Sequence, residues 1–261
     1  MVHVNDYDAF CFDLDGTIYV EDTLLLGVKD LISSLRNHNK KVLFISNTSI
    51  HTREACKERL GKMGIETSVD EIITTNYLAA RLFKQNIPNA KVYIVGEHSL
   101  IEQLMNVSIK LTTNPLEATH VLVGLDRDFT YNKLGHAMQA VRNGAKIIVT
   151  NPDVVCPVMD GYIADTFVLA QAIETASEKK IDMIIGKPSA YYSRAIIDLL
   201  RVPYEKCLIV GDRLETDIML GLNSGMKTCL VLTGVTKRAD IEDTRIYPDY
   251  VVENLSELLF A

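Results

Sequence analysis

The sequence predicts an α/β protein built on a doubly wound, mostly parallel sheet. Short apolar runs rich in β-branched residues recur along the 261-residue chain, as expected for strands that are buried on both faces of a parallel sheet. These runs are followed by stretches in which apolar residues have helical spacing, and an alternation of strand and helix is typical of doubly wound folds. Several runs also stop abruptly at polar residues, which is where such folds bind their ligands.

Four of the predicted strands end in residues that can carry chemistry. They are 7–12 before Asp13 and Asp15, 41–45 before Ser46 and Asn47, 181–185 before Lys187, and 207–210 before Asp212 and Asp217. Because the carboxyl ends of parallel strands meet at one edge of a sheet, we expect these side chains to converge there. Alternate residues of a strand face the same side, so Asp13 and Asp15 are expected to face one way.

The first part of the chain alternates strands and helices. After the first strand, apolar residues at helical spacing predict a helix over 23–37. A second helix is predicted over 52–63, where Thr52 can cap the amino end and Gly64 is placed to end the helix. Residues 72–75 are expected to form another short strand.

A second sheet is predicted within the chain, between the strand ends at Ser46 and Lys187. Its strands and helices alternate over 91–95, 99–105, 119–123, 131–143 and 146–150. This βαβαβ unit interrupts the first sheet as an insert of roughly 100 residues, an ordinary size for a domain. We therefore expect a core formed by residues 1–77 and 181–261, and an inserted α/β cap formed by residues 78–180.

The last part of the chain is expected to return to the first sheet. Thr216 could cap a helix over 217–224. A strand over 227–232, a short edge strand over 250–252 and a closing helix over 255–260 complete the core.

Composition and charge disfavour several classes of protein. The net charge is −7 and no basic stripe is present, so nucleic acid is not an expected partner. No apolar run approaches the ~20 residues that span a membrane, and the amino end lacks the features of a secretory signal, so a cytoplasmic location is expected. The five cysteines form no metal-binding pattern with histidine, which disfavours zinc.

The polar strand ends resemble, in order, the four motifs of the haloacid dehalogenase superfamily of phosphatases. They are residues 13–17 (Asp-Leu-Asp-Gly-Thr), Ser46-Asn47, Lys187, and 211–213 (Gly-Asp-Arg) with Asp217. The resemblance covers essentially the whole chain. The segment 150–153 (Thr-Asn-Pro-Asp) and the long insert before Lys187 are similar to the NagD-type, p-nitrophenyl-phosphatase-like branch. That branch includes sugar, nucleotide, phosphoglycolate and pyridoxal phosphate phosphatases.

The resemblance implies a role for each carboxylate. Asp13 would be the nucleophile that forms an aspartyl-phosphate, and Asp15 the general acid and base. A Mg²⁺ cofactor would be bound by Asp13, by the backbone carbonyl of Asp15 and by Asp212, since Mg²⁺ prefers oxygen ligands. For Asp217 two interpretations stay open, because an acid in the first turn of a helix suits the helix dipole and could equally support the metal ligands.

Further residues would bind and select the substrate. Ser46 and Asn47 would hold the transferring phosphoryl group by hydroxyl and backbone N–H, and Lys187 would neutralise the charge of carboxylates and phosphate. Asn151 and Asp153 follow a strand of the cap, the region with which the family selects substrates. Asn-Pro-Asp is also a routine turn sequence, so a purely structural role is the alternative.

The expected activity is the Mg²⁺-dependent hydrolysis of small phosphate monoesters, with sugar phosphates favoured by the resemblance. Phosphoglycolate, pyridoxal phosphate and nucleotides are alternative substrates, and a phosphomutase would use the same chemistry. A ligand-binding regulatory protein on the same scaffold is the non-enzyme alternative, which the presence of both Asp13 and Asp15 disfavours. Relatives often dimerise through the cap, so a homodimer is a further expectation.

Overall fold

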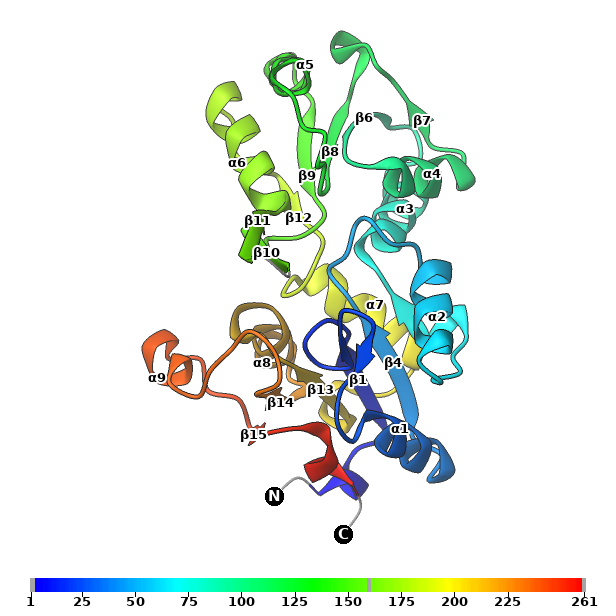
Figure 1. Cartoon of the computed structure of the whole chain (residues 1–261). Helices are drawn as coiled ribbons and strands as arrows, with labels where there is room; N and C mark the ends of the chain where they lie inside the picture. Colours follow the sequence, from blue (N-terminus) through cyan, green and yellow to red (C-terminus); the bar gives the residue numbers. More distant parts are fainter. Residues whose placement is uncertain (1–2, 159–160, 260–261) are drawn as a thin grey trace. The chain divides into compact units, whose positions relative to one another are not determined.

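The computed structural model describes residues 3–158 and 161–259, which fall into two compact units (Figure 1). The first unit contains Met1–Ser46, Arg53–Ile73 and Lys187–Ala261, and the second contains Asn47–Thr52 and Thr74–Gly186. Each unit is organised around a parallel sheet with helices, so the predicted α/β class is confirmed. Among the described residues, no helix has the length and apolar character needed to cross a membrane.

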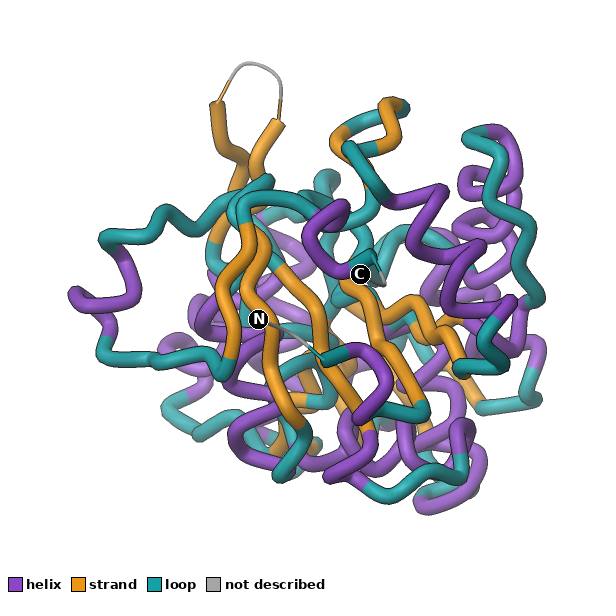
Figure 2. Tube along the Cα trace, turned by 90° about the horizontal axis from the view of Figure 1, so that it is seen from below, coloured by secondary structure: helices purple, strands orange, loops and turns teal. Residues whose placement is uncertain are grey.

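In the sheet of the first unit, the strand that ends at the predicted nucleophile, Asp13, lies in the interior. The strands of this sheet lie in the order β15-β14-β13-β1-β4-β5 and pair in parallel. The strands are β1 (Ala9–Asp13), β4 (Lys41–Ile45), β5 (Ile72–Ile73), β13 (Cys207–Gly211), β14 (Lys227–Val231) and β15 (Tyr250–Val252). Figure 2 shows strands side by side with helices beside them. This order places the carboxyl ends of β1, β4 and β13 next to one another.

Both faces of this sheet are buried, which explains the continuous apolar runs of its strands. Phe10 and Phe12 belong to a core that includes Leu31 of α1 (Val28–Asn37). The intervening Cys11 is equally buried. On α8, Gly221 lies against Ile209 of β13. The further helices of this unit are α2 (Arg53–Lys62), α7 (Ala190–Leu200), α8 (Met219–Ser224) and α9 (Asp240–Thr244).

The helix predicted over 23–37 begins later than expected. Residues 19–24 form an antiparallel ribbon of β2 (Tyr19–Val20) and β3 (Thr23–Leu24), and α1 starts only at Val28. Gly27 has φ 81°, a left-handed conformation that glycine adopts without strain. Leu24 packs on the core from the ribbon, so its apolar character reflects burial rather than a helix.

The second unit has a sheet of its own, in the order β12-β9-β8-β6-β7, with all pairs parallel. The strands are β6 (Lys91–Val95), β7 (Lys110–Leu111), β8 (His120–Val123), β9 (Lys146–Val149) and β12 (Met183–Ile184). The helices are α3 (Thr75–Asn86), α4 (His98–Asn106), α5 (Tyr131–Arg142) and α6 (Thr166–Ser177). An antiparallel pair, β10 (Val155–Val158) with β11 (Gly161–Ala164), stands apart from this sheet.

The strand predicted over 181–185 belongs to a different sheet from the one expected. Only Met183–Ile184 form a strand, β12, which pairs with β9 of the second unit. The assignment of this run to the first sheet was therefore wrong. A short apolar run predicts a buried strand but carries no information about which neighbour it will pair with.

Two predictions for the last part of the chain also change. The helix after Asp212 begins with a π-helical turn, Leu214–Ile218, that leads into α8, so Thr216 lies inside the helical segment and does not cap it. The closing helix is a single 3₁₀ turn, Leu255–Leu258, and residue 260 lies outside the described residues. Other 3₁₀ turns are Val4–Asp6, Val69–Glu71, Pro115–Glu117 and Tyr204–Lys206.

Candidate active site

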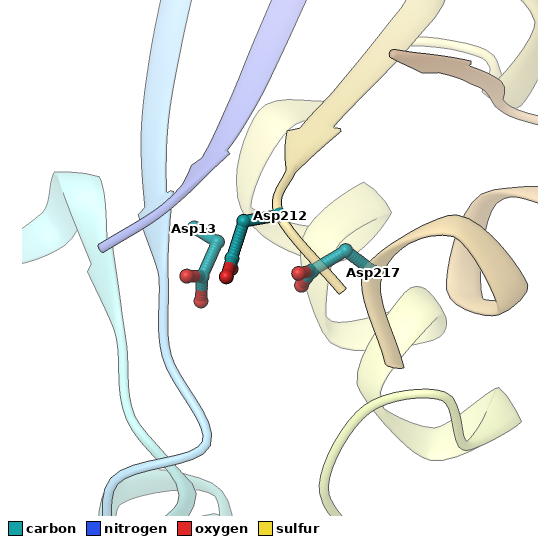
Figure 3. A group of neighbouring side chains, drawn as sticks. All are labelled: Asp13, Asp212 and Asp217. Atoms are coloured by element: carbon teal, nitrogen blue, oxygen red, sulfur yellow. The ribbon is translucent and has the colours of Figure 1, made fainter. Parts of the chain in front are cut away.

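Three carboxylates meet at the carboxyl edge of the first sheet. Asp13 ends β1, Asp212 directly follows β13, and Asp217 comes from the helical turn after it (Figure 3). One oxygen from each side chain lies within 4.8 Å of the others. Because β1 and β13 are adjacent and parallel, their ends bring Asp13 and Asp212 together.

Lys187 links two of these carboxylates. Its Nζ donates to Asp13 Oδ1 and to Asp217 Oδ1, each at 2.6 Å, and the lysine is only 2% exposed. Burial opposes the charged ammonium, but the charges of Asp13 and Asp217 outweigh it and raise the pKa of Lys187. The lysine therefore stays protonated, and the cluster holds one positive charge for three carboxyl groups.

Burial and this excess of negative charge shift the pKa values of two of the carboxyl groups. Burial raises the pKa of Asp13 well above its ordinary value, Lys187 opposes this rise, and Asp217 and Asp212 add to it. Burial, reinforced by the charge of Asp217, raises the pKa of Asp212 to about 7. Three carboxylates and one lysine thus form a site that gains from a further positive charge.

The residues present fit a Mg²⁺ ion. Asp212 Oδ2 accepts a hydrogen bond from the backbone N–H of Val235 at 2.7 Å. Its other oxygen, Oδ1, is buried and has no hydrogen-bond partner among the described residues, which is costly unless a ligand completes it. The cluster offers only carboxylate oxygens, the ligands that hard cations prefer, and neither histidine nor cysteine.

Glycines make room for the carboxylates. A Cβ added to Gly234 would lie 2.0 Å from Asp212 Oδ2, and one added to Gly211 would lie 2.3 Å from the Cβ of Asp217. Gly16 also borders Asp212 and has φ 86°, so it serves both the turn after β1 and this close approach.

Ser46 follows β4 and is almost completely buried. Its backbone N–H donates to the carbonyl of Ile73 at 2.9 Å. Its own carbonyl accepts from the hydroxyl of Tyr192 at 3.1 Å. Burial raises the pKa of Tyr192, so this phenol remains a neutral donor. The backbone that carries the Ser46 hydroxyl is therefore fixed from two sides.

Asp15 lies outside the buried cluster. The strand β1 ends at Asp13, and the chain then turns, with the N–H of Gly16 donating to the carbonyl of Tyr19 at 2.8 Å. The side chain of Asp15 is 65% exposed, and its Oδ1 is 3.8 Å from Nη1 of Arg59. β1, on which the prediction from strand alternation depends, ends two residues before Asp15, and alternation holds only as long as the strand continues.

Asn47 and the two predicted cap residues come together in the second unit. Asp153 Oδ2 accepts from Asn47 Nδ2 at 2.9 Å and from Asn151 Nδ2 at 2.8 Å. Asn151 is buried and also accepts from the hydroxyl of Thr150 at 2.8 Å. One carboxylate thus joins the segment after β4 to the carboxyl end of β9.

Residues 10–110 match the family model of haloacid dehalogenase-like hydrolases, and residues 184–258 match a second, HAD-hydrolase-like model. The chain is 35% identical to the sugar-phosphatase AraL of Bacillus subtilis over 247 residues, which cover 94% of this chain and 90% of that protein. The chain belongs to the haloacid dehalogenase (HAD) superfamily. The resemblance noted in the four motifs is confirmed, and this member is a phosphoric monoester hydrolase.

Solved structures place this HAD phosphatase in the predicted branch. A p-nitrophenyl phosphatase from Archaeoglobus fulgidus superposes with a TM-score of 0.92 at 33% identity, covering 97% of this chain and 98% of that one. NagD from E. coli K-12 superposes with a TM-score of 0.87 at 26% identity, covering 96% and 98% of the two chains.

Sequence reasoning missed several residues of this HAD phosphatase site. Tyr192 gave no signal, because it lies at a helical position that reads as ordinary core. Gly234 and Val235 follow the end of β14, so the same argument from strand ends could have found them. Arg59 reads from the sequence as one charge among many on α2.

Proposed function

We propose that this phosphatase hydrolyses small phosphate monoesters and that sugar phosphates are its favoured substrates. The proposed reaction passes through an aspartyl-phosphate on Asp13 and uses Mg²⁺ as cofactor. The observation that carries the proposal is the buried group of Asp13, Asp212 and Asp217 around Lys187 at the carboxyl edge of a parallel sheet. The similarity to a protein named sugar phosphatase supports the substrate class.

In the first step, a carboxylate oxygen of Asp13 attacks phosphorus and forms the acyl-phosphate bond. The bond from phosphorus to the ester oxygen breaks, and its electron pair goes to that oxygen. Asp15, in its protonated form, gives its proton to the same oxygen, so the leaving group departs as a neutral alcohol. Lys187 remains charged beside Asp13 and offsets the repulsion between nucleophile and phosphate.

In the second step, Asp15 is a carboxylate and accepts a proton from water. The water oxygen attacks phosphorus, and the bond between phosphorus and Asp13 breaks, which returns the Asp13 carboxylate and releases inorganic phosphate. Ser46 and Asn47 are proposed to bind the phosphoryl oxygens in both steps, by hydroxyl and backbone N–H.

Asp13, Asp212 and the backbone carbonyl of Asp15 would hold Mg²⁺, with Asp217 in support. When bound, the ion supplies positive charge that favours the ionised carboxylates and the approach of a phosphate dianion. Lys187 already pairs with Asp13 and Asp217. Asp212, whose buried Oδ1 has no hydrogen-bond partner within residues 3–158 and 161–259, is therefore the ligand that a bound ion would stabilise most.

Residues 78–180 are proposed to act as the cap that selects the leaving group, with Asn151 and Asp153 contributing to that choice. The hydrogen bonds that join Asp153 to Asn47 and Asn151 support this role. Cytoplasmic location and a homodimer through the cap stay predictions.

The test is phosphate release from sugar phosphates, phosphoglycolate, pyridoxal phosphate and nucleotides, with Mg²⁺ or with EDTA. We expect Mg²⁺-dependent release that Asp13→Asn abolishes, and a phosphorylated protein that can be trapped by rapid quenching. A phosphomutase would instead return an isomeric phosphate without net release. Phosphate release that survives Asp13→Asn would overturn the assignment of the nucleophile.

A further inference from the structure

The side chain of Arg59 contacts Asp15 and three residues close to it in the chain, Tyr19, Glu21 and Asp22. Arg59 lies near the end of α2, and its side chain is 28% exposed. Its guanidinium donates to the carbonyl of Glu21 at 2.6 Å, and its Nε is 3.4 Å from Asp22 Oδ1. The same group sits over the ring of Tyr19, with Cζ 4.2 Å from the ring centroid, and 3.8 Å from Asp15 Oδ1.

The ribbon that Arg59 contacts has little stability of its own. β2 and β3 contribute two residues each, and a two-stranded ribbon of this size is marginal without tertiary contacts. Glu21, at its turn, has φ 49°, a strained conformation for a residue other than glycine. A guanidinium stacked on the 2%-exposed Tyr19 of β2 and bonded to the Glu21 carbonyl holds the first strand and the turn of this ribbon.

The backbone connects the ribbon directly to Asp15. Asp15 forms an isolated bridge with Tyr19, and the N–H of Gly16 donates to the carbonyl of Tyr19. Arg59 therefore reaches Asp15 by two routes, through its own ion pair and through Tyr19. An exposed ion pair of this length contributes little to stability. Its relevance is that it holds the carboxyl group of Asp15 in a defined position.

We propose that Arg59 is a positioning residue for Asp15 and thereby sets how strongly the rate depends on the leaving group. The inference rests on the proposed function, in which Asp15 gives its proton to the ester oxygen as the bond from that oxygen to phosphorus breaks. An alkoxide leaving group needs this proton, whereas p-nitrophenolate is stable enough to leave without it. A misplaced Asp15 should therefore slow alkyl esters more than aryl esters.

The experiment compares kcat/KM of the full chain for p-nitrophenyl phosphate and for an alkyl phosphate such as a sugar phosphate, at saturating Mg²⁺. This ratio reports the first step alone, whereas kcat also contains the hydrolysis of the aspartyl-phosphate, in which Asp15 acts on both esters alike. Arg59→Ala should raise the ratio of aryl to alkyl kcat/KM by about 10- to 100-fold, at or below the lower limit of the ~10²–10⁴ that general acids contribute, because Asp15 itself is still present. Arg59→Lys should recover only part of this, because an ammonium cannot stack and bond through a planar fork.

The matched control is Arg36→Ala. Arg36 has a similar exposure, 32%, and also joins a helix to a neighbouring segment, through Glu71 at 3.0 Å and the carbonyl of Glu66. Its loss should lower stability without changing the aryl-to-alkyl ratio. If Arg59→Ala does not fold, Arg59→Gln runs the same comparison, since it removes the charge but can still donate to Glu21.

Asp15→Asn separates the two claims. If Asp15→Asn raises the aryl-to-alkyl ratio and Arg59→Ala does not, the inference about Arg59 fails and the proposed function stands. An Arg59→Ala variant that lowers kcat/KM equally for both esters also overturns the inference. If Asp15→Asn leaves the ratio unchanged, the assignment of the general acid fails, and the role of Arg59 falls with it.

Discussion

Replacing Lys187 with methionine tests the electrostatics on which the candidate site depends. The substitution keeps most of the side-chain volume and removes the charge that Asp13 and Asp217 share. The side chains of these two acids are 11% and 1% exposed, so water cannot take over the role of the ammonium. Breaking a buried ion pair by removing one partner costs ~3–5 kcal/mol, and two partners place the expected loss near the upper end of this range.

The cost should depend on pH. In the wild type the raised pKa of Lys187 means that its stabilisation is fully present below the unfolded-state pKa and is lost only in strong alkali, so it is constant between pH 5.5 and 8. In the variant, Asp13 loses the charge that lowers its pKa, and its folded-state pKa rises further above the unfolded value. A carboxyl group of this kind destabilises the fold as pH rises, so the loss should be smaller at pH 5.5 than at pH 8.

Urea unfolding in EDTA at both pH values measures this difference. Lys227→Met is the control, because Lys227 pairs with Asp249 at the same 2.6 Å but is 53% exposed, and such surface pairs contribute ~0–1 kcal/mol. Adding Asp217→Asn to Lys187→Met should recover part of the loss. A loss below ~1 kcal/mol at pH 8, or an equal loss at both pH values, would refute the reasoning.

Three further predictions follow from the same geometry. Gly234→Ala forces a Cβ to within 2.0 Å of Asp212 Oδ2, so we expect the Mg²⁺ affinity measured by calorimetry to weaken at least about tenfold. The control Gly135→Ala, whose Cβ would meet no atom within 4 Å, should leave that affinity unchanged. Mg²⁺ must displace the proton of Asp212, whose pKa is about 7. The Mg²⁺ affinity should therefore fall about tenfold per pH unit below that value and level off above it. A Mg²⁺ affinity independent of pH between 6 and 8 would contradict this. Tyr192→Phe removes two hydrogen bonds to buried carbonyls, those of Ser46 and Ile73, and should cost about 1–3 kcal/mol in urea unfolding. The exposed Tyr162→Phe should cost about 0.5 kcal/mol or less, and equal losses for the two variants would count against the role given to Tyr192.

The parts of the site that the sequence predicts are those that depend on strand ends. Asp13 and Asp212 each follow an apolar run, and parallel pairing of β1 with β13 is enough to bring them together. Lys187 reaches the same place although its preceding strand belongs to another sheet. Its position beside Asp13 and Asp217 therefore agrees with the order of the family motifs, whereas the argument from the sheet does not explain it.

The parts that could not be predicted depend on tertiary contacts. Nothing local distinguishes Tyr192 from a core residue, and its two carbonyl partners come from other segments of the chain. Asp15 lies beyond the end of β1 and its side chain is 65% exposed, and strand ends are the least certain feature of any pattern. The contacts of Arg59 with the ribbon arise only once α2 has packed.

The border between the two units has a consequence for how the candidate site is completed as the chain is made. Ser46 belongs to the first unit and Asn47 to the second, and the same border falls again between Gly186 and Lys187. The ion pair of Lys187 with Asp13 joins residues 174 positions apart along the chain and closes a loop that contains the segments of the second unit, so this contact can form only after those segments have been made.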